Sequence, residues 1–122
     1  MSTAGVTVVL SGGGAKTAAH IGAARALAEA GLVPVRYVAT SMGAVVAAAL
    51  AGGATEDLVD RLAEAGRTGI ARDPLAVARG LYARSLLRAA PFRRAVESLV
   101  PARRFADLPV PLTVSVVDLD TG

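Results

Sequence analysis

The chain has 122 residues, a length that suits one domain and is too short for two. Apolar residues make up 53% of the sequence and charged residues 19%, which is typical of a globular domain and excludes a disordered tail. The sequence has no cysteine and one histidine. It therefore excludes a disulfide scaffold, a cysteine nucleophile, and a zinc site built on thiolates or on several histidines.

The hydrophobic pattern predicts strands and helices in alternation. The expected strands are residues 6–10, 34–39 and 112–117, and the expected helices are residues 15–30, 41–50, 55–66 and 91–100. This order predicts an α/β layered fold with a largely parallel sheet. Turn residues follow the last expected strand, from Asp118 to Gly122. We therefore expect a further strand after them and, without it, an uncovered sheet edge and face.

Positive charge is concentrated between Arg67 and Arg104, where nine arginines and two acidic residues give a local charge of +7. Such a segment suits anionic lipid headgroups, so peripheral contact with an anionic membrane is one prediction, and solvated helix faces are the alternative. Few aromatic residues accompany the arginines, which argues against nucleic acid. The uncharged run from Tyr37 to Thr55 is too rich in small residues for a membrane span, and residues 1–5 carry no basic group. We therefore expect a cytoplasmic protein.

Ser41 lies between an expected strand and an expected helix, in the sequence Ala39-Thr40-Ser41-Met42-Gly43. This is the position of a nucleophile elbow, a tight turn that lifts a serine hydroxyl out of the backbone. Gly43 fits the usual G-x-S-x-G pattern, and Ala39 departs from it by one methyl group. The alternative is a serine that caps the N-terminus of the helix.

Three glycines, Gly12, Gly13 and Gly14, separate the first expected strand from the first expected helix. Their bare backbone N–H groups, at the N-terminus of a helix, could hold an anion or an oxyanion. Lys16 follows them as a candidate anion contact. An oxyanion hole beside a serine nucleophile is one interpretation, and a plain glycine-rich turn is another.

Two nucleotide-binding interpretations of the same loop fit less well. A dinucleotide fingerprint needs a glycine where Thr17 stands. A phosphate-binding P-loop matches the Lys16-Thr17 pair, but its two required glycines would fall at Leu10 and Ala15. A nucleotide-binding module of the P-loop kind stays an alternative function, as does a non-catalytic fragment that binds anionic lipid.

Taken together, these motifs resemble the patatin-like phospholipase family. The resemblance runs through GGGAK at residues 12–16, HIG at 20–22, EAG at 29–31, VATSMGA at 38–44 and VDLDTG at 117–122. It implies a three-layer α/β/α fold with a mostly parallel central sheet, of which residues 1–122 would be the N-terminal part. It also implies hydrolysis of acyl ester bonds in phospholipids or other lipids, with no cofactor and no metal.

The resemblance implies a role for each matching residue. Ser41 is the nucleophile that forms an acyl-enzyme, and the amides of Gly12 to Gly14 hold the oxyanion. The family works with a Ser–Asp dyad, so His20 is expected to be structural. The dyad Asp stands in an Asp-Gly-Gly or Asp-Gly-Ala motif downstream of the segment that Asp118 and Asp120 match. The chain is therefore expected to be inactive alone, with a complementing C-terminal half as a partner.

Overall fold

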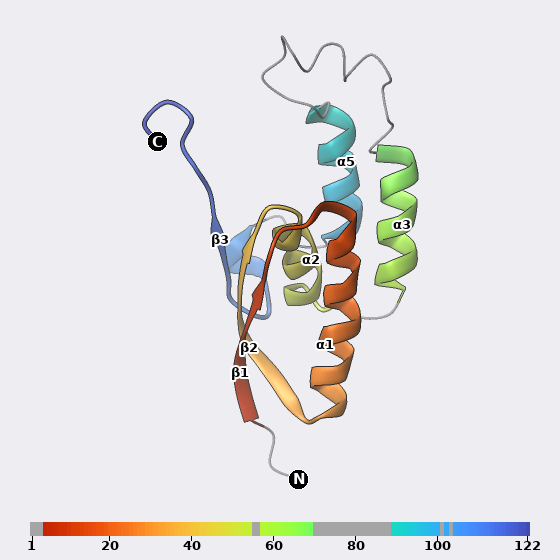
Figure 1. Cartoon of the computed structure of the whole chain (residues 1–122), viewed down its shortest axis with the longest axis vertical. Coiled ribbons are helices and arrows are strands. Elements are labelled where there is room, and N and C mark those ends of the chain that lie inside the picture. Colours follow the sequence, from red (N-terminus) through yellow and green to blue (C-terminus); the bar gives the residue numbers. More distant parts are fainter. Residues whose placement is uncertain (1–3, 55–56, 70–88, 101, 103) are drawn as a thin grey trace.

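The computed structural model describes residues 4–54, 57–69, 89–100, 102 and 104–122. Strands β1 (Ala4–Leu10), β2 (Leu32–Thr40) and β3 (Leu112–Ser115) form one parallel sheet in the order β1-β2-β3 (Figure 1). The helices are η1 (Gly14–Ala18), α1 (Ala19–Glu29), α2 (Met42–Ala51), α3 (Leu58–Gly69), α5 (Ala89–Leu99) and η2 (Phe105–Asp107), of which η1 and η2 are 3-10 helices. The predicted α/β fold with a parallel sheet is confirmed.

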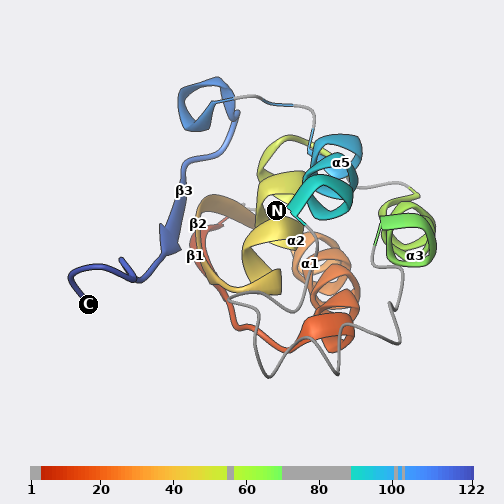
Figure 2. The same ribbon diagram turned by 90° about the horizontal axis from the view of Figure 1, so that it is seen from above.

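The described helices lie on one side of the sheet, as the view from above in Figure 2 shows. The connections from β1 to β2 and from β2 to β3 advance in the same direction along the sheet. Because such crossovers are right-handed, both place their helices on the same face. α1 and α2 pack against the strands, and α3 and α5 pack against each other on the outer side of this layer.

Small side chains let α2 lie close to its neighbours. Ala47 and Ala49 are fully buried, together with Leu10, Tyr37 and Ala39 on the strands. α2 has almost no polar side chain because it lies between the sheet and the α3–α5 pair, and a helix that is apolar on all sides belongs in the interior. The abundance of alanine in the sequence is thus explained by close packing around this helix.

The first predicted helix, residues 15–30, is divided in the structure into η1 and α1. Thr17 is the cause, since its hydroxyl donates a hydrogen bond of 2.7 Å to the Gly14 carbonyl oxygen. The Lys16 amide donates to the Gly13 carbonyl oxygen at 3.1 Å, which is the tighter spacing of a 3-10 turn. The prediction of one continuous helix was therefore wrong in its first turn.

Most of the other predicted boundaries differ from the structure by one to three residues. α3 continues through Gly66 to Gly69, because a glycine inside a helix costs only about 1 kcal/mol relative to alanine and does not end it alone. The last strand ends at Ser115 because its partner β2 ends at Thr40, the residue paired with Ser115. The expected start of the third helix, residues 55–56, lies outside the described residues.

The face of the sheet opposite the helices carries exposed valines. Val9 is 72% exposed, and Val33 and Val35 are about half exposed. No described helix covers this face, so the uncovered apolar surface expected from the sequence is present in the described part of the chain.

Candidate active site

Ser41 connects β2 to α2 and has the backbone conformation of a sharp turn. Its φ of 52° and ψ of −137° lie in a region that residues with a side chain rarely adopt, and such strain is found mostly at functional sites. The side chain is exposed and makes no capping hydrogen bond to α2. The alternative of a serine side-chain cap is therefore not supported, and the hydroxyl is presented at the tip of the turn.

The residues around Ser41 pack as a nucleophile elbow requires. A Cβ atom at Gly43 would overlap the backbone carbonyl oxygens of Ser11 and Leu10, so only glycine fits where α2 begins beside the end of β1. Ala39 is 3% exposed and lies in the regular part of β2, so its additional methyl group is accommodated in the core. Thr40 ends β2 with an exposed side chain, and Met42 begins α2.

The glycine loop passes directly beside Ser41. A Cβ atom at Gly12 would lie 2.9 Å from the Ser41 Cβ and 3.5 Å from the Ser41 Oγ, so the bare backbone of Gly12 faces the serine side chain. Parallel pairing of Leu10 with Ala39 explains this proximity, because it brings the carboxyl ends of β1 and β2 to the same edge of the sheet. The two motifs that the sequence separates by more than twenty residues thus meet at one place.

The amides of Gly12 and Gly13 donate no hydrogen bond to any other residue in the described ranges. They therefore remain available to an external acceptor beside Ser41. His20 holds the adjoining backbone, since its Nε2 lies 3.0 Å from the Ser11 carbonyl oxygen. A carbonyl oxygen only accepts, so Nε2 carries the hydrogen, and His20 acts as a structural anchor between α1 and the loop.

Lys16 and Thr17 follow the loop and differ in what they do. The Lys16 side chain is exposed, as a candidate anion contact must be. Thr17 is 2% exposed, and its buried hydroxyl is satisfied by the Gly14 carbonyl oxygen. Thr17 therefore fixes the end of the glycine loop, a role that sequence reasoning missed although a threonine near a helix start often bonds a preceding carbonyl.

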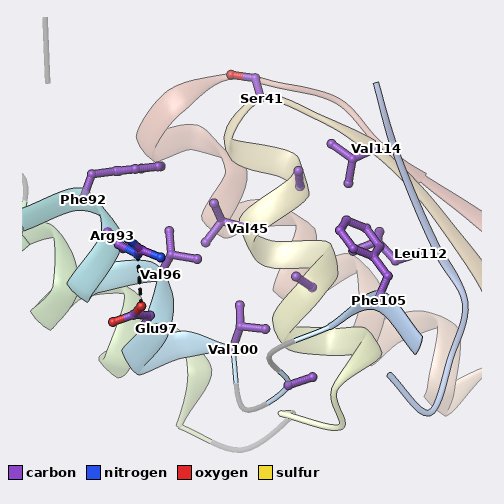
Figure 3. Close-up of a pocket in the computed structure, with 13 residues that line it drawn as sticks. Ser41, Val45, Phe92, Arg93, Val96, Glu97, Val100, Phe105, Leu112 and Val114 are labelled. Atoms are coloured by element: carbon purple, nitrogen blue, oxygen red, sulfur yellow. Dashed lines mark ion pairs between the residues drawn. The ribbon is translucent and has the colours of Figure 1, made fainter. Parts of the chain in front are cut away.

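A groove of about 750 Å³ begins at Ser41 and runs between α2, α5 and β3. Figure 3 shows Ser41 at one end of it and apolar side chains along both walls. We call it the Ser41 groove; besides Ser41 its lining consists of Ala44, Val45, Ala48, Phe92, Arg93, Val96, Glu97, Val100, Ala102, Phe105, Leu112 and Val114. Arg93 and Glu97 form an exposed ion pair of 3.3 Å within α5. The volume is that of a typical small-molecule site.

The sequence indicated only part of this groove. The spacing of Phe92, Val96 and Leu99 predicts one apolar face for the helix 91–100. In the structure Phe92 and Val96 line the groove, and Leu99 is buried in the core. β3 contributes Leu112 and Val114, which alternate with exposed residues along the strand. Their place opposite α5 depends on tertiary packing, so no local signal could have found it.

Much of the arginine-rich segment lies outside the described residues. Those arginines are Arg72, Arg79, Arg84, Arg88 and Arg103. Contact with an anionic membrane through residues 67–104 therefore stays a prediction. Among the helices that the structure describes, none combines the length and the hydrophobicity needed to cross a bilayer.

Asp118 stabilises the turn that follows β3 through hydrogen bonds. Its carboxylate accepts a hydrogen bond of 2.9 Å from the Asp120 amide, and this bond lowers the pKa of Asp118. The Gly122 amide closes the same turn on the Asp118 carbonyl oxygen. The turn chemistry expected from the sequence is confirmed. Within the described ranges, no group of three or more acidic or histidine side chains could hold a metal ion.

Comparison with known proteins gives relatives but no structural neighbour. The chain is 34% identical over 119 residues to proteins named as uncharacterized NTE family proteins from Mycobacterium bovis and from two strains of Mycobacterium tuberculosis. The match covers 96% of this chain and 32% of each relative, so the chain spans about a third of their length. No solved structure matches the chain.

The family comparison covers nearly all of the fold described above. The model of the family described as patatin-like phospholipase matches residues 8–119. The matched region extends from β1 through the glycine loop and the Ser41 turn to the end of β3. The chain belongs to the patatin-like phospholipase family.

Proposed function

We propose that this chain carries the nucleophile and the oxyanion hole of a serine lipid acyl hydrolase. One observation carries the proposal: Ser41, in a strained turn, faces the bare backbone of Gly12 at the end of an apolar groove. Family membership supports lipid hydrolysis as the class of reaction. The substrate class is an acyl ester, with phospholipids included.

The arrangement suits acyl transfer. The Ser41 Oγ attacks the ester carbonyl carbon, a carbon–oxygen bond forms, and the carbonyl oxygen takes the negative charge. The free amides of Gly12 and Gly13, together with that of Gly14, are the donors for this oxyanion. When the intermediate collapses, the leaving alkoxide takes up the proton that Ser41 gave up and departs as the alcohol, and the acyl group remains on Ser41. Water then adds its oxygen to the carbonyl carbon, a proton returns to the Ser41 Oγ, and the acyl group is released as a carboxylic acid.

Attack by Ser41 requires a general base that takes the proton of its hydroxyl, and the 122 residues do not include the motif that carries this base. The resemblance assigns that role to an aspartate in an Asp-Gly-Gly or Asp-Gly-Ala motif, and the 122 residues contain neither. Asp118 is engaged in its turn. Without a base the hydroxyl keeps its proton near neutral pH, so we expect the 122-residue chain alone to turn over ester substrates very slowly.

A fluorophosphonate probe tests the nucleophile. The chain is joined to the remaining two-thirds of the Mycobacterium tuberculosis relative, and the fusion is compared with its Ser41→Ala and Ser11→Ala variants. Ser11 is a matched control, since it is exposed and adjoins the same loop. We expect labelling in the fusion and in Ser11→Ala and none in Ser41→Ala. Equal labelling of all three proteins would contradict the proposal, and Mg-ATP binding that Lys16→Ala abolishes would favour the nucleotide-binding alternative.

Contact with the membrane surface belongs to the same proposal. The local charge of +7 in residues 67–104 favours anionic headgroups, by about 1 kcal/mol for each basic residue near the surface. We expect the chain to bind phosphatidylserine vesicles at low salt and to be released as salt rises. Ser41→Ala should bind equally, and absence of binding at low salt would remove this part of the proposal.

A further inference from the structure

Two alanines of α2 lie in the Ser41 groove behind the serine. Ala44 and Ala48 line the groove, and both are partly buried. They follow Ser41 by three and seven residues, so they lie about one and two helical turns from it, at about 4.5 and 10 Å along the helix axis. Neither side chain extends beyond Cβ. Along α2 the lining is therefore lower at these two positions than at Val45, the third α2 residue that lines the groove.

The remaining walls are apolar and larger. Val96 lies on α5 and Val100 directly follows this helix, and Leu112 and Val114 come from β3 (Figure 3). Apart from Ser41, the polar side chains of the lining are Arg93 and Glu97, which are paired with each other. A peptide segment in this groove would leave its backbone N–H and C=O groups without partners, whereas a hydrocarbon chain has none to satisfy. The lining therefore selects a hydrocarbon.

We propose that Ala44 and Ala48 determine the length of the acyl chain that the groove accepts. A single unbranched chain lies along α2, with its carbonyl end at Ser41 and its methyl end beyond Ala48. The position of the carbonyl end rests on the proposed function. The binding of the hydrocarbon rests on the lining alone, so the two can be tested separately.

The proposal predicts how affinity depends on chain length. Each methylene group that enters the groove raises the binding constant about fourfold, and the gain stops where the chain leaves the groove. Leucine at position 48 fills the floor two turns from Ser41, so the gain should stop at a shorter chain. Leucine at position 44 blocks the groove one turn from Ser41, so the gain should stop earlier still.

The test measures binding of saturated fatty acids, from hexanoate to palmitate, to the purified 122-residue chain. Each acid displaces a fluorescent fatty acid at concentrations below micelle formation. We expect Ala48→Leu to bind hexanoate like the unaltered chain and palmitate at least about tenfold more weakly. The affinity of Ala44→Leu should stop rising with acid length at a shorter acid than the affinity of Ala48→Leu does. Ala23→Leu, at an exposed position of α1, is the matched control and should follow the unaltered chain.

Several results would overturn the proposal. One is that the affinity of the unaltered chain does not depend on the length of the acid, and another is that the leucine variants lose affinity for hexanoate and palmitate equally. A third such result is that affinity stops rising at the same acid length in both leucine variants. Ala48→Val adds less volume and, if the leucine variant does not fold, should show the same break in weaker form. Ser41→Ala should keep the length dependence. If the length dependence is retained and fluorophosphonate labelling of the fusion fails, the proposal that Ser41 is a nucleophile is rejected and the proposal that the groove binds an acyl chain stands.

Discussion

Gly12 controls where the Ser41 side chain lies. The space on the Gly12 side of the serine is too small for any additional carbon, because a Cβ there would approach the Ser41 Cβ to 2.9 Å. Atoms at that distance must move, and the strained Ser41 backbone leaves them little room to do so. The geometry of the candidate site thus depends on the absence of one methyl group.

Gly12→Ala should therefore inactivate the site more than it unfolds the protein. We expect overpacking to destabilise the fold by about 1–3 kcal/mol and misplacement of the hydroxyl to slow fluorophosphonate labelling of the fusion by about 100-fold. Labelling rate and urea denaturation measure the two effects. Gly22→Ala is the control, since nothing lies within 4 Å of its added Cβ and it should stabilise α1 by up to about 1 kcal/mol. Normal labelling of Gly12→Ala would show that the loop does not abut the serine.

Tyr37 gives the fold a dependence on alkaline pH. It is 4% exposed, and burial raises the pKa of its phenol above the ordinary value of 10.0. The folded state therefore holds its proton more tightly than the unfolded state. The contribution to stability is complete below pH 10 and is lost as pH rises through the folded-state pKa. We expect urea stability to fall above pH 10 and Tyr37→Phe to fall less steeply, and identical slopes for the two proteins would contradict this account.

At the scale of elements, local patterns predicted the strands and α2 well. The β-branched run before the glycines is enough to predict β1, and the small residues of the Ser41 turn are enough to predict where β2 ends. Thr17 shows where this reasoning fails, because its hydroxyl competes for the Gly14 carbonyl and makes the first turn a 3-10 helix. The Ser41 groove could not be predicted, because the pairing of Thr40 with Ser115 brings together segments far apart in the chain.

The role assigned to Thr17 is testable. Thr17→Val keeps the shape of the side chain and removes the hydroxyl, which leaves the Gly14 carbonyl oxygen without its 2.7 Å hydrogen bond. We expect a loss of about 1 kcal/mol in the free energy of unfolding. Thr113→Val, at an exposed position of β3, should change it by less than about 0.5 kcal/mol. Equal values for the two variants would show that the hydroxyl does not order the loop.

At the scale of the whole molecule, the described residues cover only one face of a parallel sheet. Parallel sheets are almost always covered on both faces, because the helices of their crossover connections pack against the sheet, and their strands are therefore rich in apolar residues. Here Val9, Val33 and Val35 are exposed on the open face, and the chain matches about a third of the length of its relatives. In the part of the chain that the structure describes, this face is therefore an apolar surface that a covering layer would bury.

That surface should make the isolated chain self-associate. Replacing Val9 and Val33 with threonine keeps a β-branched shape that strands favour and puts hydroxyl groups on the open face. We expect light scattering of the unaltered chain to rise with protein concentration and that of the double variant to rise much less. Thermal unfolding should change little, since neither side chain is in the core. Val59→Thr removes an exposed valine from α3 and should leave association unchanged, so an equal reduction there would assign the association to general hydrophobicity instead of the open face.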